Sequence, residues 1–298
     1  MEQNILQVKD LRVSYYTYAG EVQSVRGVSF YVKKGETLAI VGESGCGKSV
    51  TAKSIMRLIA DPGKIKDGSS IVFDGRDVLA MRKRELRSYR GDDCAMIFQD
   101  ALTSLDPTMK VGKQIAEVLK IHGKANGKRA AAQAVELLRQ VGIPNPERRA
   151  QEYPHQFSGG MRQRAMIATA LACSPKLLIA DEPTTALDVT IQAQIIDLMK
   201  QLQQQTGTAI ILITHDLGVV ADIAQRICVM YSGKIVECGS ARDIFYRPRH
   251  PYTLALLSSV PRLDLKNKQE LVTIDGTPPD LLQPPAGCPF CTRCKYCM

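Results

Sequence analysis

The chain of 298 residues is long enough for a full hydrophobic core, and its 45% hydrophobic content excludes a disordered protein. It contains no run of about 18 apolar residues, and MEQNILQVKD lacks the basic start and apolar stretch of a secretory signal. We therefore expect a cytosolic chain that is soluble when isolated. The net charge of +9 is dispersed except in MRKRELRSYR, so we expect no nucleic-acid partner.

Strands of two kinds are predicted in the first and later parts of the chain. Residues 5–33 alternate apolar and polar positions, which indicates antiparallel strands with one buried face. TLAIVG, KLLIAD and AIILITHD are short apolar runs, typical of parallel strands buried on both faces. Because ligands bind beyond the carboxyl ends of such strands, we expect the residues that end these runs to converge. These are Gly42, Asp181, Glu182, Thr214 and His215.

The stretch GESGCGKS, from Gly42 to Ser49, has the spacing of a phosphate-binding loop and stands between an apolar strand and a helical run. Its glycines let backbone N–H groups turn toward phosphates, Lys48 can reach the β- and γ-phosphates, and Ser49 can ligate Mg²⁺. A glycine-rich turn with an incidental lysine is the alternative, which the strand–loop–helix order disfavours. The predicted nucleotide contacts are Gly42, Ser44, Gly45, Cys46, Gly47, Lys48, Ser49 and Val50.

Acidic and polar residues elsewhere complete a predicted hydrolytic site. In LLIADEP, Asp181 can hold Mg²⁺ through water and Glu182 can deprotonate the attacking water, although adjacent acids also occur at helix N-termini. His215 can hold the γ-phosphate, with a buried structural histidine as the alternative, and Gln99 can reach the metal or the water unless it is a solvated loop residue. We predict catalytic roles for Lys48, Gln99, Glu182 and His215, and Mg²⁺ binding by Ser49, Gln99 and Asp181.

A helical insertion is predicted from Asp106 to Cys173. One helix has Val111, Ile115, Val118 and Leu119 on one face, and the next has Val135, Leu138 and Val141. The insertion contains FSGGMRQR, in which Ser158 is a good N-cap and two glycines leave the first amides of a helix accessible to a phosphate. The alternative is a capped amphipathic helix with Met161, Ala165, Ala168 and Leu171 in the core.

After about Gly239 the sequence becomes proline-rich and ends in a concentration of cysteines. Cys288, Cys291, Cys294 and Cys297 stand at two-residue gaps, a spacing that can hold an iron–sulfur cluster or zinc, with unligated thiols as the alternative. The other cysteines are scattered, as expected of reduced thiols; they are Cys46, Cys94, Cys173, Cys228 and Cys238.

Five motifs in order resemble those of ABC transporter ATPases: Gly42–Ser49 as Walker A, Gln99 as Q-loop, SGGMRQR as signature, LLIADEPTTALD as Walker B with D-loop, and His215 as switch histidine. The resemblance implies an α/β P-loop NTPase fold. It further implies a RecA-like core with an antiparallel β subdomain at residues 1–105 and 174–240, a helical subdomain at 106–173, and a C-terminal extension at 241–298.

In that family the signature of one subunit covers the ATP held by Walker A of another, in a head-to-tail dimer. The resemblance therefore implies that Ser158, Gly159 and Gly160 contact the partner's ATP and that Asp188 signals across the interface. The family also stacks adenine on an aromatic residue before Walker A. Tyr15 fits that place best, with Tyr16 and Tyr18 as alternatives.

The C-terminal stretches RHPYTLALLSSVPRLD and GTPPDLLQPPAGCPF resemble the D-type ATPases of oligopeptide, dipeptide and nickel importers. In several such relatives the cysteines hold a four-iron, four-sulfur cluster. Their pattern reads C-P-F-x-x-R-C and continues, whereas this chain adds Cys291 and Cys297 and stops at Met298. Either the chain is truncated within the motif, or its four cysteines are the ligand set.

The resemblance implies an ATP-hydrolysing subunit on the cytoplasmic face of the cell membrane that powers uptake of oligopeptides, dipeptides or nickel. The implied partners are two membrane-spanning permease subunits, an extracytoplasmic solute-binding protein and a second ATPase, an F-type paralogue. A soluble ABC ATPase acting on nucleic acid or ribosomes is the alternative, but no long coiled-coil insertion or second ATPase unit is present. An iron–sulfur regulator with a degenerate ATPase is disfavoured by the intact Lys48, Asp181, Glu182 and His215.

Overall fold

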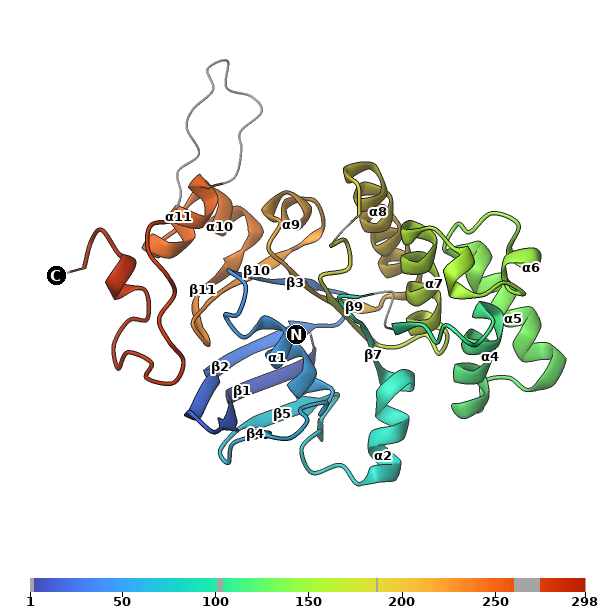
Figure 1. The fold of residues 1–298 in the computed structure, drawn as a ribbon, viewed down its shortest axis with the longest axis horizontal. Coiled ribbons are helices and arrows are strands. Elements are labelled where there is room, and N and C mark those ends of the chain that lie inside the picture. The colour runs from blue at the N-terminus through green and yellow to red at the C-terminus, as the bar shows by residue number, and fades with distance from the viewer. Residues whose placement is uncertain (1–2, 101–103, 186, 260–273, 298) are drawn as a thin grey trace, which may run out of the picture. The chain divides into compact units, whose positions relative to one another are not determined.

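The computed structural model describes residues 3–100, 104–185, 187–259 and 274–297 (Figure 1). The chain divides into two compact units. The first contains residues 1–5, 33–36 and 80–211, and the second contains residues 6–32, 37–79 and 212–298. The predicted division into core, helical subdomain and extension stays a prediction.

An antiparallel sheet forms where the sequence alternates. Its strands are β1 (Asn4–Thr17), β2 (Gly20–Lys33), β4 (Gly63–Ile65), β5 (Ser70–Phe73) and β6 (Arg76–Asp77). Their order is β2-β1-β5-β6, and β4 also pairs with β1. Leu6 and Val8 of β1 are buried, and so are Leu11 and Val13, so a period of two holds on either side of Asp10, whose φ of 44° interrupts the alternation. The predicted antiparallel strands are confirmed.

A second sheet contains the three apolar runs. Its strands are β3 (Thr37–Val41), β7 (Cys94–Ile97), β8 (Leu177–Asp181), β9 (Ala209–Thr214), β10 (Arg226–Tyr231) and β11 (Lys234–Ser240), in the order β11-β10-β3-β9-β8-β7. β3 pairs parallel with β10, and β7 pairs parallel with β8, whereas β11 is antiparallel to β10. Every residue of β3, β8 and β9 is buried, which confirms the prediction of strands covered on both faces.

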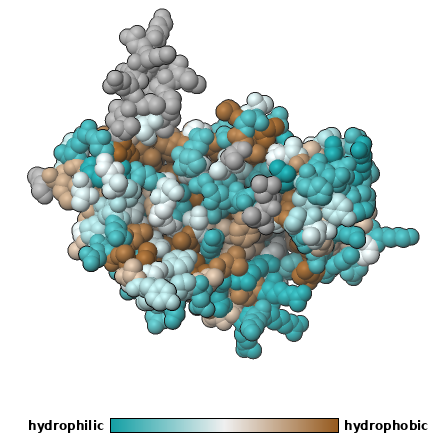
Figure 2. Space-filling view, viewed as in Figure 1, coloured by the Kyte–Doolittle hydropathy of each residue, from teal (hydrophilic) through white to brown (hydrophobic). Residues whose placement is uncertain are grey.

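The first unit contains the predicted helical segment. Its helices are α2 (Lys83–Ser88), α4 (Val111–Ile121), α5 (Gly127–Gln140), α6 (Pro146–Arg149), α7 (Gly159–Leu171) and α8 (Val189–Thr206). Short turns lie at Tyr89–Asp93 and Pro154–Gln156. The predicted faces of α4 and α5 are buried except for Val118 and Val135, which are half-buried at the edges of their stripes. Figure 2 shows a mostly hydrophilic surface over α4, α5 and α6.

The second unit carries helices α1 (Lys48–Ile55), α9 (Leu217–Ile223), α10 (Ala241–Tyr246) and α11 (Pro251–Ser258), and a short turn at Cys291–Arg293. The C-terminal segment contributes to its core, because Phe290 packs with Tyr231 and Tyr252 at ring-centroid distances of 5.3 Å. Within the described ranges, no helix combines the length and apolarity needed to cross a membrane.

Candidate ATP site

The phosphate loop lies between β3 and α1, and its glycines are required for two different reasons. At Gly42 and Gly47 a Cβ would lie 2.0 Å from the Met230 carbonyl oxygen and 2.4 Å from the Ser24 carbonyl oxygen. Gly45 has open space around it but a φ of 77°, which side chains disfavour. The backbone can therefore fold into a narrow loop that ends at the N-terminus of α1, a shape that fits a phosphate group.

Lys48 lies inside this loop. The buried side chain donates from Nζ to the carbonyl oxygens of Gly42 at 2.8 Å and Glu43 at 2.9 Å. Ser49 follows in the first turn of α1 and is half-buried. Burial raises the pKa of the Cys46 thiol, so this side chain stays neutral in the loop. Lys48 and the N-terminus of α1 thus both lie at this loop, and phosphate binding there stays a prediction.

The carboxylate predicted to act as a base is held by two donors. β8 ends at the buried Asp181, and Glu182 follows with a φ of 49°. Glu182 Oε2 accepts hydrogen bonds from Gln99 Nε2 at 3.0 Å and from Thr185 Oγ1 at 2.9 Å. The structure therefore brings together Gln99 and Glu182, which the sequence placed in one site. Thr185 was not predicted for this group. The only sequence feature that points to it is its position three residues after Glu182.

The signature segment begins α7 as predicted. Ser158 Oγ accepts from the Met161 amide at 3.3 Å, which confirms the N-cap. A Cβ on Gly160 would lie 2.9 Å from Ile191 Cγ2, so this glycine also permits close packing against the start of α8. Asp188 caps that helix by accepting from the Ile191 amide at 2.9 Å. The amphipathic alternative holds as well: Ala165, Ala168 and Leu171 are buried, and Met161 is half-buried.

The remaining predicted residues lie in the second unit. His215 follows β9 and is exposed, while the Asp216 amide donates to Thr214 Oγ1 at 3.0 Å. Tyr15 is half-buried, with its ring over Gly63. Tyr16 is 47% exposed, and Tyr18 is fully exposed. The adenine contact of Tyr15, with Tyr16 and Tyr18 as alternatives, stays a prediction.

The motif residues are divided between the two units. Lys48, Ser49 and His215 belong to the second unit, whereas Gln99, Asp181, Glu182 and the signature belong to the first. Their predicted convergence on one nucleotide stays a prediction. By itself, the second unit provides a phosphate loop with its lysine. The first unit provides a carboxylate oriented by two side chains.

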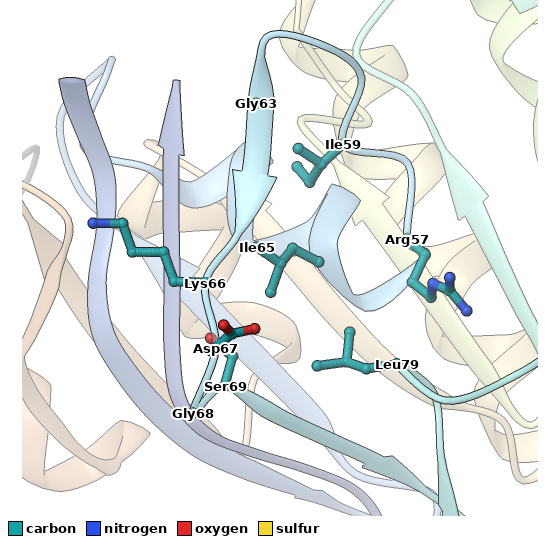
Figure 3. A pocket seen from close by; sticks show the side chains of 9 residues that line it. All are labelled: Arg57, Ile59, Gly63, Ile65, Lys66, Asp67, Gly68, Ser69 and Leu79. Carbon is teal, nitrogen blue, oxygen red and sulfur yellow. The ribbon is translucent and has the colours of Figure 1, made fainter. Parts of the chain in front are cut away.

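A cavity of about 450 Å³ in the second unit lies between β4 and the chain after α1 (Figure 3). The side chains of Ile59, Ile65 and Leu79 face one another across it, whereas Lys66 points away toward β2, where it pairs with Glu21. None of the residues that line it belongs to the predicted nucleotide motifs. We therefore assign the cavity no part in ATP binding.

The C-terminal cysteines differ from the predicted set of four thiolates. Cys291 and Cys297 form a disulfide bond, and Cys288 and Cys294 are not disulfide-bonded. The two bonded residues have a Cα–Cα distance of 5.5 Å, which suits a disulfide. Two of the four predicted ligands are thus used by one bond in this structure, so the ligand set is not assembled in it.

Comparison with known proteins agrees with these features. Residues 25–185 match the family model described as ABC transporter, and residues 236–298 match the model described as oligopeptide/dipeptide transporter, C-terminal region. Among solved structures, a dimeric ATP-binding cassette in a post-hydrolysis state bound to ADP and Pi has a TM-score of 0.71 and 28% identity, covering 80% of this chain and 99% of that one.

Curated relatives cover nearly the whole chain. The oligopeptide transport ATP-binding protein OppD of Bacillus subtilis is 60% identical over 295 residues, which are 99% of this chain and 82% of that one. The dipeptide transport ATP-binding protein DppD of the same organism is 58% identical over 98% of this chain and 87% of its own length. OppD of Salmonella typhimurium is 53% identical over 99% and 87%. With these relatives and a family model matching over half of its length, the chain belongs to the ABC transporter family.

Proposed function

We propose that this chain hydrolyses ATP to drive the import of oligopeptides or dipeptides through separate membrane subunits. The observation that carries the proposal is the Glu182 carboxylate, held by Gln99 and Thr185 directly after a buried strand. A carboxylate fixed in this way can accept a proton from the attacking water. The names of the relatives support peptides over nickel as the transported solute.

Each residue has a proposed task in this reaction. Lys48 and the loop amides bind the phosphates, Glu182 accepts the proton of the attacking water, and Gln99 and His215 orient that water and the γ-phosphate. Mg²⁺, when bound, would be held by Ser49, Gln99 and Asp181 and would neutralise charge on the phosphates. Tyr15 would stack on adenine.

The signature residues serve a second nucleotide in this proposal. Ser158, Gly159 and Gly160 begin α7, whose first amides can bind an anion held by another subunit. Asp188, at the start of the neighbouring α8, would signal across the interface between the two subunits. We infer a head-to-tail pair of ATPase subunits on the cytoplasmic face of the membrane, bound to two permease subunits that receive solute from a binding protein.

The test is Glu182→Gln in the assembled transporter in vesicles. We expect ATP turnover and peptide uptake to fall at least about a hundredfold, because the general base is lost while ATP binding remains. The variant should also accumulate as an ATP-bound dimer. Glu117→Gln, an exposed change on α4, is the matched control. Rapid turnover by Glu182→Gln would remove this residue from the base role.

The second ATPase in the native complex is proposed to be an F-type paralogue. The support is the resemblance of the C-terminal segment to D-type ATPases, which often pair with such a subunit. Mass measurement of the intact native complex should find one copy of this chain and one related ATPase. Two copies of this chain without a second ATPase would exclude the heterodimer.

We also propose that Cys288, Cys291, Cys294 and Cys297 bind a four-iron, four-sulfur cluster after reduction of the Cys291–Cys297 bond. Their spacing supports the proposal, since thiolates at two-residue gaps suit a cubane cluster. Protein prepared anaerobically with reductant should contain iron and acid-labile sulfide, and Cys294→Ser should lower both. Zinc in their place would identify the alternative metal, and absence of metal and sulfide would exclude the cluster.

A further inference from the structure

The C-terminal segment makes a direct ion pair with the phosphate loop. Arg293 Nη1 lies 2.8 Å from Glu43 Oε2, although the two residues are 250 positions apart in the sequence. The Arg293 side chain is 5% exposed and that of Glu43 is 24% exposed. Glu43 is the second residue of GESGCGKS, so this contact reaches the loop predicted to hold ATP.

The remaining donors of Arg293 fix its guanidinium in place. Nη1 also donates to the Tyr231 hydroxyl at 3.1 Å, Nη2 donates to the Ile274 carbonyl at 2.9 Å, and Nε donates to the Asp275 carbonyl at 2.9 Å. Burial by itself lowers the pKa of Arg293, but its bonds to Glu43 and Tyr231 outweigh burial and raise it. The guanidinium is therefore a charged, rigid anchor for the Glu43 carboxylate.

Glu43 is held at three points, and one of them leads to Lys48. Its amide donates to the Tyr252 hydroxyl at 3.0 Å, its carboxylate accepts from Arg293, and its carbonyl accepts from Lys48 Nζ at 2.9 Å. Tyr252 is buried at the start of α11, in the core that includes Phe290. The position of the loop lysine is thus connected to the C-terminal segment through a single residue.

Other contacts of the C-terminal segment hold it near the phosphate loop. The Gln23 amide donates to the Leu281 carbonyl at 2.9 Å, and Arg26 Nη2 donates to the Pro285 carbonyl at 2.8 Å. A space of about 140 Å³ is lined by residues of the loop, among them Glu43 and Cys46, and by Pro278, Pro279 and Leu281 of this segment. The segment therefore contacts β2 and lies near the loop before the chain reaches Arg293.

We propose that Arg293 is a positioning residue for ATP binding: it holds Glu43, and through Glu43 the phosphate loop, in the conformation that receives the phosphates. This inference rests on the proposed ATPase function. Its physical basis is preorganisation, because a loop that is already ordered loses less conformational freedom on binding. It has an electrostatic part too, since Arg293 neutralises a carboxylate that would otherwise stand beside the phosphates.

The experiment uses Arg293→Met in the full transporter, with the KM for ATP and kcat measured separately. We expect the KM to rise about tenfold, the effect of one strong charged contact, with kcat within about twofold of the parent. Lys295→Met removes the same charge from an exposed position two residues away and should leave both constants unchanged. Arg293→Lys keeps the positive charge, so its KM should lie between those of the parent and of Arg293→Met.

A second change separates positioning from a general loss of structure. In the Arg293→Met background, Glu43→Gln removes the unpaired carboxylate but does not restore the lost anchor, so the KM should fall only part of the way toward the parent value. A complete return to the parent KM would assign the whole effect to charge and overturn the positioning role. If Arg293 had only a structural role, the second substitution would add to the damage. The fraction of active protein would fall further, and the measured kcat would fall with it. If Arg293→Met does not fold, Tyr252→Phe removes the anchor of the Glu43 amide with little change in volume and should raise the KM about threefold.

The outcomes separate this inference from the proposed function. Parent transporter without ATPase activity would contradict the proposed function. If the parent transporter is active and Arg293→Met has the same KM as the Lys295→Met control, the positioning role is overturned. The ATPase assignment would then remain intact. Where Arg293→Met does not fold, an unchanged KM in Tyr252→Phe would overturn it as well.

Discussion

At the scale of single residues, the glycines of the phosphate loop illustrate what a motif states and what it leaves out. The spacing of Gly42, Gly45 and Gly47 predicts a phosphate loop, but it does not say which glycine meets another part of the chain. Gly42 faces the Met230 carbonyl oxygen, and Gly47 faces that of Ser24, both from distant strands. Arg293 escaped the sequence analysis for the same reason, since its role depends on contacts that no local pattern encodes. Thr185 stands only three residues after Glu182, but that spacing alone does not state that its hydroxyl donates to the carboxylate.

The steric role of Gly42 gives a prediction for stability. Gly42→Ala should lower the free energy of unfolding by about 3 kcal/mol, because the new methyl group meets a backbone oxygen that cannot move freely. Gly68→Ala is the matched control: this glycine also has a positive φ but open space around it, so the cost should be about 1 kcal/mol. Chemical denaturation of both variants measures the difference. Equal losses would show that the loop can shift to accept a side chain.

At the scale of elements, the sequence predicted two roles for the start of α7, helix capping and anion binding, and the second stays a prediction. The cap is confirmed by the bond from the Met161 amide to Ser158 Oγ. The contact of Gly160 with α8 was not predictable, because periodicity gives the buried face of a helix but not its partner. Similarly, the apolar runs predicted β3, β8 and β9, whereas the less uniform β10 and β11 were not recognised as strands.

The two roles of Ser158 can be separated by substitution. Ser158→Asp keeps a good N-cap but places a negative charge where the partner's γ-phosphate is proposed to bind. We expect normal thermal stability with at least about a hundredfold loss of ATP turnover in the assembled complex. Ser240→Ala removes the comparable cap of α10 and should lower stability by about 1 kcal/mol without loss of turnover. Full turnover by Ser158→Asp would limit Ser158 to capping.

At the scale of the whole molecule, the motifs predicted the family and the fold class because each motif is a local pattern with its own chemistry. The antiparallel strands, the buried strands and the helical segment follow from periodicity. The docking of the C-terminal segment on the phosphate loop could not be predicted, since Arg293 and Glu43 meet only after the intervening chain has folded. The disulfide between Cys291 and Cys297 was also not predicted, because spacing alone does not separate a bonded pair from a ligand set.

We propose that hydrolysis needs two polypeptides, each covering nucleotide held by the other. ATP turnover per chain, measured over a dilution series in which sedimentation gives the fraction of dimer, tests it most directly. We expect turnover to follow the dimer fraction and to disappear in the monomer. Undiminished turnover by demonstrably monomeric protein would contradict it.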